Sequence, residues 1–133
     1  MIDTLEIERE KILFVGDNTD VLDLIATLFG ATHFILTANS GKTGLAMAIT
    51  EAPDLILLDV KMPDMDGFAV CGRLKSSAET ENIPVIFLTE KTGEEYELAG
   101  LRAGGIDYIS TSIVPQVVEA RIRNHLSQKS LLD

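Results

Sequence analysis

Asp59 and Thr89 come directly after short runs of branched or aromatic residues, and Asp17 comes one residue after another such run, where buried strands would end. If these runs are parallel strands, their carboxyl ends share one edge of a sheet, and open α/β folds keep their ligand sites at that edge. Two neighbouring carboxylates repel each other, and Mg²⁺ relieves this because it is usually held by one or two carboxylates, waters and phosphate oxygens. The hydroxyl of Thr89 could then bind a phosphate oxygen. The set predicts a phosphate-handling metal site.

The stretch around Asp59 is the most informative part of the chain. Residues 55–58 are four branched apolar residues in a row, a pattern typical of a strand buried on both faces. The loop that follows, 60–67, turns the chain away, and Gly67 can adopt backbone conformations that other residues resist. A lone acid after a strand is often only a cap or a turn residue. The binding interpretation of Asp59 therefore depends on the polar groups that reach the same edge from other strands.

Strand and helix signals alternate along the rest of the chain. Asn18 or Thr19 can cap a helix that stops at Gly30, and Ser40 can cap the next helix. Five strand–helix repeats with short connections predict an α/β fold, a doubly wound five-stranded parallel sheet in a flavodoxin-like three-layer sandwich. Strands are expected at 11–15, 33–38, 54–59, 84–88 and 107–110, and helices after Asn18, after Ser40, over 68–76, around 96–101 and over 114–130.

Composition is that of an ordinary globular protein. The 133 residues, 46% hydrophobic and 24% charged, predict a single domain over 1–133 with a core at about 11–127. The formal net charge of −10 argues against nucleic acid or an anionic membrane as a partner. No apolar run approaches the ~18 residues of a membrane span and no signal peptide opens the chain, so the expected compartment is the cytoplasm. The single cysteine, Cys71, predicts a small core residue and no disulfide framework.

Several common catalytic patterns do not occur in the sequence. There is no Gly-x-Gly-x-x-Gly or Gly-x₄-Gly-Lys-Ser/Thr loop to cradle a nucleotide, and no Cys–His or Ser–His–Asp set. His33 and His125 are expected to be surface or edge residues. A flavodoxin-like cofactor binder stays open as an alternative, although the chain has no Trp for stacking. An independent phosphohydrolase also stays open, but it would need a second acid–base group near Asp59.

Four blocks of sequence, in matching order and spacing, resemble the receiver domain of two-component response regulators. The resemblance implies a signalling domain and not an enzyme, with at most self-catalysed phosphotransfer and dephosphorylation. It also implies a histidine kinase or a phosphotransfer protein as partner. The blocks are Ile-Leu-Phe-Val-Gly-Asp-Asn (12–18), Leu-Ile-Leu-Leu-Asp-Val-Lys-Met-Pro-Asp-Met-Asp-Gly-Phe (55–68), Pro-Val-Ile-Phe-Leu-Thr (84–89) and Ala-Gly-Gly-Ile-Asp-Tyr-Ile (103–109).

The resemblance also implies roles for individual residues. Asp59 would match the aspartate that accepts the phosphoryl group. Asp17 and Asp59 would match Mg²⁺ ligands, with the backbone carbonyl of Lys61 as a third ligand. Thr89 would match the switch hydroxyl that contacts the phosphoryl group. Tyr108 would match the aromatic residue that changes rotamer on activation and reshapes the face made by the fourth helix, fifth strand and fifth helix.

Three residues depart from the family pattern. Gly16 replaces the first of two successive acids, so weaker Mg²⁺ affinity is expected. Thr111 stands where the family has a lysine that neutralises the phosphoryl group, and Glu90 places a long anion where the family has a small residue. Losing one such electrostatic contact commonly costs ~2.7–4 kcal/mol of transition-state stabilisation. Lys61 and Lys91 are candidate compensating cations.

Two versions of the signalling role stay open. In one, Asp59 is phosphorylated with Mg²⁺ and shifts the population towards an active interaction face. In the other, the site is degenerate and the domain binds partners independently of phosphorylation. Residues 115–126 resemble the ending of receivers joined to cyclic-di-GMP enzymes or other output domains. A covalently linked output domain and a homodimer are therefore among the implied partners, with 128–133 as a tail or linker and a frayed terminus as the alternative.

Overall fold

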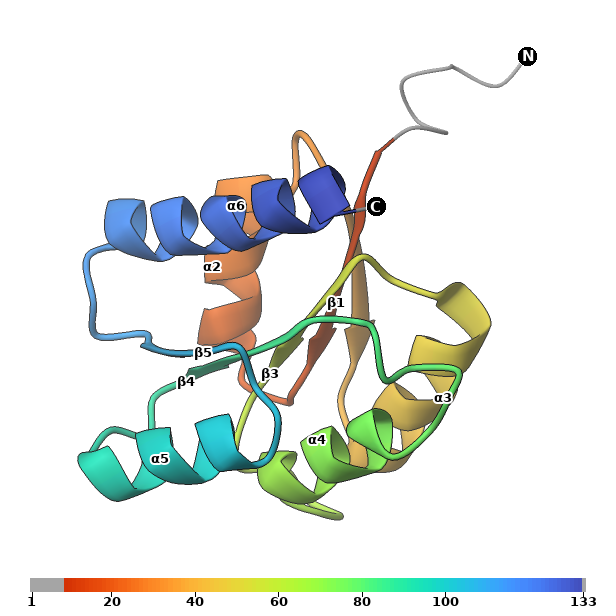
Figure 1. Cartoon of the computed structure of the whole chain (residues 1–133). Helices are drawn as coiled ribbons and strands as arrows, with labels where there is room; N and C mark the ends of the chain where they lie inside the picture. The colour runs from red at the N-terminus through yellow and green to blue at the C-terminus, as the bar shows by residue number, and fades with distance from the viewer. Residues whose placement is uncertain (1–8, 133) are drawn as a thin grey trace.

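The computed structural model describes residues 9–132, which form five strands and five helices in strict alternation (Figure 1). Residues 1–8 and Asp133, which belong to the predicted domain and its tail, lie outside the described part. The elements are β1 (Lys11–Val15), α2 (Thr19–Phe29), β2 (Phe34–Ala38), α3 (Gly41–Glu51), β3 (Leu55–Leu58), α4 (Gly67–Lys75), β4 (Val85–Thr89), α5 (Glu94–Arg102), β5 (Asp107–Ser110) and α6 (Pro115–Leu132).

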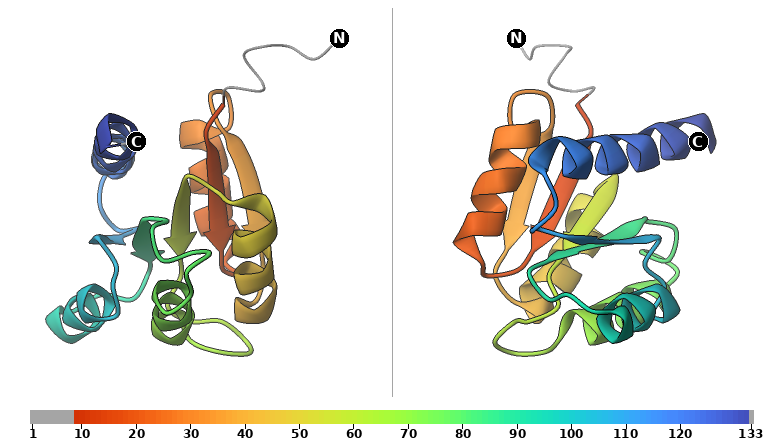
Figure 2. Two further views of the ribbon diagram at one scale, coloured as in Figure 1. Left: turned by 45° about the vertical axis from the view of Figure 1, so that its right-hand side comes forward. Right: turned by 90° about the vertical axis from the view of Figure 1, so that its left-hand side faces the viewer.

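All five strands pair in parallel in one sheet with the order β2-β1-β3-β4-β5. Helices α2 and α6 cover one face of the sheet, and α3, α4 and α5 cover the other (Figure 2). The predicted doubly wound five-stranded parallel sheet is confirmed. Because every strand is parallel to its neighbours, the residues that follow the strands meet at one edge.

Each face of the sheet has its own apolar core, and β1 contributes alternate residues to both. Leu13 and Val15 pack with α3 and α4, whereas Ile12 and Phe14 pack with α2 and α6. This alternation is the two-residue period of a strand. The four residues of β3 are all 0% exposed, as their unbroken apolar run predicts for a central parallel strand. Cys71 also lies in the core, as predicted.

The predicted elements differ from the observed ones by only one or two residues at their ends. β2 begins at Phe34 instead of His33, and β3 is one residue shorter at each end than 54–59. β4 continues to Thr89 because the Thr89 carbonyl accepts a hydrogen bond from the Thr111 amide at 3.0 Å. α6 continues to Leu132, two residues beyond the predicted 130. Among residues 9–132 no helix is both long and apolar enough to cross a membrane.

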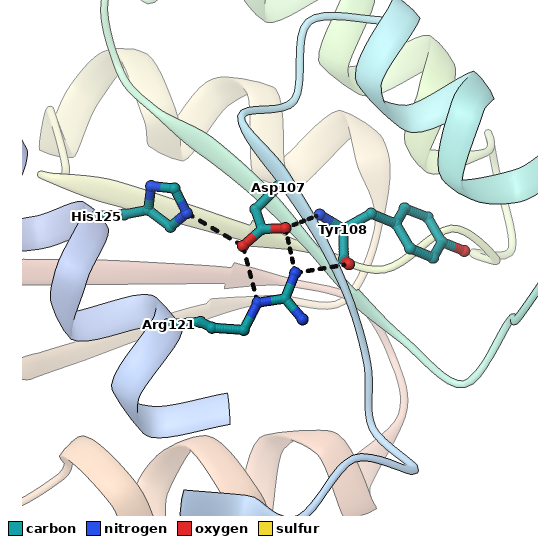
Figure 3. A network of polar contacts seen from close by, with 4 residues as sticks. All are labelled: Asp107, Tyr108, Arg121 and His125. Atoms are coloured by element: carbon teal, nitrogen blue, oxygen red, sulfur yellow. Dashed lines mark hydrogen bonds and ion pairs between the residues drawn. The ribbon is translucent and has the colours of Figure 1, made fainter. Parts of the chain in front are cut away.

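A carboxylate at the start of β5 ties α6 to the edge of the sheet (Figure 3). Both oxygens of Asp107 accept hydrogen bonds from the guanidinium of Arg121, and one of them lies 3.1 Å from Nε2 of His125. The amide of Tyr108 donates to the same carboxylate at 2.8 Å. Burial alone would raise the pKa of Asp107, but the hydrogen bonds from Arg121, Tyr108 and His125 outweigh burial and lower it. The network therefore fixes the backbone beside Tyr108.

The prediction that His33 is a surface or edge residue holds only in part. His33 precedes the edge strand β2, but its ring is only 9% exposed and meets the ring of Phe29 edge-on, with centroids 5.4 Å apart. Thr32 Oγ1 lies 2.7 Å from its Nδ1. Burial, and then the positive charge of Arg123, lower the pKa of His33 from its usual 6.5.

Because the folded state disfavours the charged form of His33, the unfolded state binds more protons at this residue below about pH 6.5. We therefore expect the free energy of unfolding to fall as pH drops from 7 to 5.5, by at most about 1.4 kcal/mol per pH unit for this one group. Urea unfolding of wild type and His33→Gln at several pH values isolates the effect. The variant should show a smaller loss, and an equal loss in both proteins would contradict the prediction.

Candidate functional site

The ends of β1, β3 and β4 surround an open cavity of about 340 Å³ at the carboxyl edge of the sheet. The cavity brings together residues from three loops that are far apart in the sequence. Asp17, Asp59 and Thr89 all contribute to its wall, as do both lysines that were considered as compensating cations. Its lining residues are Asp17, Asn18, Asp59, Lys61, Met62, Pro63, Thr89, Glu90 and Lys91.

Asp59 follows the last residue of β3 and is only 6% exposed. Its amide donates to the carbonyl of Val15 at 2.9 Å, which continues the pairing with β1 by one residue. Its Oδ1 accepts a hydrogen bond from the amide of Val60 at 2.7 Å. Within residues 9–132, the second oxygen has no hydrogen bond to protein. Asp59 therefore presents one anchored oxygen and one oxygen without a protein donor.

Asp17 lies in the loop between β1 and α2 and is exposed. The next residue, Asn18, caps α2, because its side-chain oxygen accepts hydrogen bonds from the amides of Asp20 and Val21. The cap fixes where the helix begins, and so limits where Asp17 can lie. Asn18 was predicted only as a cap, but it also lines the cavity.

The donor chemistry at the cavity suits a hard divalent cation. Two carboxylates, on Asp17 and Asp59, line the same space as Lys61, whose backbone carbonyl was the expected third ligand. Mg²⁺ is commonly held by one or two carboxylates and completes its shell with water and phosphate oxygens, so this set fits it. Across the described part of the chain, no group of three His, Cys, Asp or Glu side chains is placed to hold a metal ion together, in keeping with the glycine at position 16.

The structure explains why position 16 carries no side chain. A Cβ built on Gly16 would lie 2.7 Å from Cζ of Phe14 and 2.9 Å from Cβ of Asp59, closer than real contacts allow. The ring of Phe14 is 1% exposed and belongs to the α2/α6 core, so it has little freedom to move. An aromatic ring thus occupies the space that an acid at position 16 would need. From the sequence, Phe14 is predicted only as a strand residue.

Thr89 and Tyr108 are connected through the backbone of Lys91. The Lys91 amide donates to Oγ1 of Thr89 at 3.1 Å, and the Lys91 carbonyl accepts from the hydroxyl of Tyr108 at 2.7 Å. Thr89 is 0% exposed and keeps its own hydroxyl hydrogen for another acceptor. The Tyr108 ring is 7% exposed and stacks on Phe87. Burial, followed by the negative charge of Asp59, raises the pKa of Tyr108 to about 12, so its hydroxyl remains a donor at neutral pH.

The charges around the cavity are close to balanced. Asp17, Asp59 and Glu90 contribute three negative charges to the lining, and Lys61 and Lys91 contribute two positive ones. In the ion pairs found across residues 9–132, neither of these lysines takes part.

Thr111 is not among the lining residues, although the family pattern places a lysine at its position. Its amide is used in backbone pairing with Thr89. Nearby, the hydroxyls of Ser110 and Ser112 lie 2.7 Å apart and hydrogen-bond each other. The cationic groups at this cavity therefore come from the loops after β3 and β4, and not from the loop after β5.

Comparison with known proteins gives one consistent result. The family model for the response regulator receiver domain matches residues 12–123. The response regulator PleD of Caulobacter vibrioides is 40% identical over 124 residues, which are 92% of this chain but only 27% of PleD. This chain thus spans about a quarter of the length of that relative.

Solved structures agree with the family model. A putative response regulator from Chloroflexus aurantiacus superposes with a TM-score of 0.84 at 28% identity, over 90% of this chain and 99% of its own. The BeF₃-activated receiver domain of Klebsiella pneumoniae RstA superposes with a TM-score of 0.81 at 32% identity, over 88% of this chain and 98% of its own.

The contact between positions 14 and 16 gives a direct test of packing. We expect Gly16→Ala to lower the free energy of unfolding by about 1–3 kcal/mol, as overpacking of a core usually does. In a Phe14→Leu background, where Cζ is absent, the same change should cost less. Gly72→Ala is the matched control, because a Cβ on Gly72 meets nothing within 4 Å. Urea unfolding measures all four variants, and equal costs for Gly16→Ala in both backgrounds would rule out the clash.

Proposed function

This chain belongs to the response regulator receiver domains of two-component systems, and we propose that Asp59 is its phosphoacceptor. The phosphoryl group would come from a histidine kinase or a phosphotransfer protein. In this role the chain is a regulatory domain and not an enzyme with a separate substrate. The observation that carries the proposal is the buried carboxylate of Asp59, which lines one cavity with Asp17, Thr89 and Lys91.

The transfer itself needs one nucleophilic oxygen on Asp59. An oxygen lone pair forms the P–O bond while the P–N bond of a phosphohistidine breaks, and the imidazole nitrogen keeps the electron pair. When the other ring nitrogen of the phosphohistidine carries a proton, the products are an acyl phosphate on Asp59 and a neutral imidazole. The oxygen without a protein donor is the candidate nucleophile, since the Val60 amide holds the other one. Thr89 can donate its hydroxyl hydrogen to a phosphoryl oxygen, because its own oxygen already accepts from Lys91.

The cavity would hold Mg²⁺ on Asp17, Asp59 and the Lys61 carbonyl. When bound, the metal ion supplies positive charge beside the phosphoryl oxygens. Its affinity should be lower than in receivers with two successive acids, because position 16 contributes no carboxylate.

Lys91 is the better candidate for the missing cation. Its backbone is held on both sides, by Thr89 and by Tyr108, so its side chain starts from a fixed point in the cavity wall. Lys61 also lines the cavity, but it is exposed, and within the described residues its own backbone groups form no hydrogen bond. A fixed base reduces the entropy lost when an ammonium group pairs with a phosphoryl oxygen.

Phosphorylation would act on contacts made by the face of α5, β5 and α6, which lie side by side in Figure 1. Tyr108 connects Lys91 in the cavity wall to this face. A charge that moves Lys91 would therefore favour a different position of the aromatic ring, which is a shift between populations. The apolar side chains exposed on these elements and the turns beside them are Leu98, Leu101, Ile106, Val114 and Val117.

The proposal extends to the partners and the location of the chain. Since the chain covers only 27% of PleD, we propose that it is joined to an output domain. A homodimer formed through the α5–β5–α6 face is a further proposed assembly. A kinase that spends ATP works in the cytoplasm, which is the proposed location.

Beryllofluoride, a mimic of the phosphoryl group, tests the phosphoacceptor role. With Mg²⁺ and beryllofluoride, we expect amide shifts in the NMR spectrum at Thr89 and Tyr108, and these shifts should disappear in Asp59→Asn. Acetyl phosphate should add the mass of one phosphoryl group to wild type only. Folded wild-type protein that shows neither change at any Mg²⁺ concentration would favour a docking module that works without phosphorylation.

Lysine substitutions test the proposed cation. We expect Lys91→Ala to slow phosphorylation by acetyl phosphate about tenfold, which is 1.4 kcal/mol of barrier. This is less than the loss of a buried, preorganised donor, because the Lys91 side chain is partly exposed. Lys61→Ala should have a smaller effect. Lys42→Ala, which removes an exposed lysine outside the cavity, is the control for net charge. Equal rates for the Lys91 and Lys42 variants would remove Lys91 from the proposal.

A further inference from the structure

The loop between β3 and α4, residues 60–66, carries the carbonyl of Lys61 and forms one wall of the cavity. The base of the loop is closed tightly. The Gly67 amide donates to the Val60 carbonyl at 2.7 Å, and a Cβ on Gly67 would lie 2.1 Å from the carbonyl oxygen of Asp59. Only glycine fits such an approach. These contacts at Gly67 fix only the base of the loop, so other contacts must hold its tip.

Asp64 holds the tip of the loop against the first turn of α3. Its Oδ1 accepts from the Gly41 amide at 2.8 Å and its Oδ2 from the Lys42 amide at 2.9 Å. The first amides of a helix have no partner within the helix and favour a negative charge. These two hydrogen bonds lower the pKa of Asp64 below its usual value. Asp64 lies 23 residues from Gly41 in the sequence, so the contact joins two separate parts of the chain.

Side-chain packing reinforces the same contact. A Cβ on Gly41 would lie 2.3 Å from Cγ and 2.6 Å from Sδ of Met65, so the loop rests directly on the helix start. Within the described part of the chain, the two bonds to Asp64 are the only hydrogen bonds that join residues 61–65 to other segments.

The helix does not depend on Asp64 alone for its cap. Ser40 is the N-cap of α3, and its Oγ accepts from the Thr43 amide at 3.2 Å. The Ser40 cap stabilises the helix without contacting the β3–α4 loop. The Asp64 carboxylate both caps the helix and holds the loop. Asp64 itself is exposed and does not line the cavity.

We infer that Asp64 is a positioning residue that clamps the β3–α4 loop onto α3 and so holds the Lys61 carbonyl at the metal site. This inference rests on the proposed Mg²⁺-dependent function. Without the clamp, the carbonyl would have to be ordered when the cation binds, and the lost entropy would weaken binding.

Two variants of the same helix start test the clamp. Asp64→Ala removes the hydrogen bonds between the β3–α4 loop and the start of α3. Ser40→Ala removes a cap of the same helix but keeps those hydrogen bonds. Mg²⁺ is titrated into each ¹⁵N-labelled protein, with the Val60 and Lys61 amides as the reporters. Backbone ¹⁵N order parameters of the metal-free proteins are measured at Lys61, Met62 and Met65. Asp64→Asn, which keeps one acceptor oxygen, should fall between wild type and Asp64→Ala.

We expect Asp64→Ala to raise the Mg²⁺ dissociation constant about tenfold, the lower end of the range for groups that support a metal's ligands. It should also lower the order parameters in the loop. Ser40→Ala should lower the thermal midpoint and leave the dissociation constant unchanged. Equal dissociation constants for the two alanine variants, or unchanged loop order parameters in Asp64→Ala, would overturn the clamp. If wild type binds no Mg²⁺, the proposed metal site fails, and the order parameters of the metal-free proteins still decide whether Asp64 orders the loop.

Discussion

The carboxylate of Asp59 is buried at the end of a strand that is itself buried on both faces, and the surrounding structure must accommodate that charge. A carboxylate out of water is costly unless donors or opposite charges face it. Here the Val60 amide takes one oxygen, and Lys61 and Lys91 line the same cavity. Parallel pairing of the central strands makes this possible, because it brings the loops after β1, β3 and β4 to one edge.

Packing in the core limits how much negative charge the site can carry. The Phe14 ring lies where a side chain at position 16 would have to go, so the β1–α2 loop offers one acid, Asp17. Fewer acids weaken the attraction for a divalent cation, and the two lysines weaken it further. The same lysines would help neutralise an incoming phosphoryl group. In the proposed function, lysine side chains of the protein therefore supply part of the positive charge that the metal ion supplies in other receivers.

In the main hydrogen bonds around the site, one of the two partners is a backbone group. The amide and carbonyl of Lys91 join Thr89 to Tyr108, and two amides of α3 hold Asp64. Such contacts survive substitution of the side chains whose backbones they use. The ammonium of Lys91 can therefore be removed without breaking the path from the cavity to the α5–β5–α6 face.

The fold was predictable from sequence because each element carries its own local signal. Apolar runs, caps such as Asn18 and Ser40, and short connections indicate parallel strand–helix repeats, and these repeats bring the strand ends to one edge. Element ends were less well determined, since backbone bonds from a neighbouring strand decide whether a residue such as Thr89 belongs to the strand.

Only the tertiary structure decided the contacts between residues whose types do not indicate that they would meet. The sequence determined that position 16 lacks the usual acid, but not that the Phe14 ring occupies its space. It placed His33 at the start of a strand, but not beneath the surface against Phe29. It showed Asp64 as one more acid in a turn. The physical reason is the same in each case: side-chain direction and helix placement are set by packing across the sheet, which no local pattern encodes.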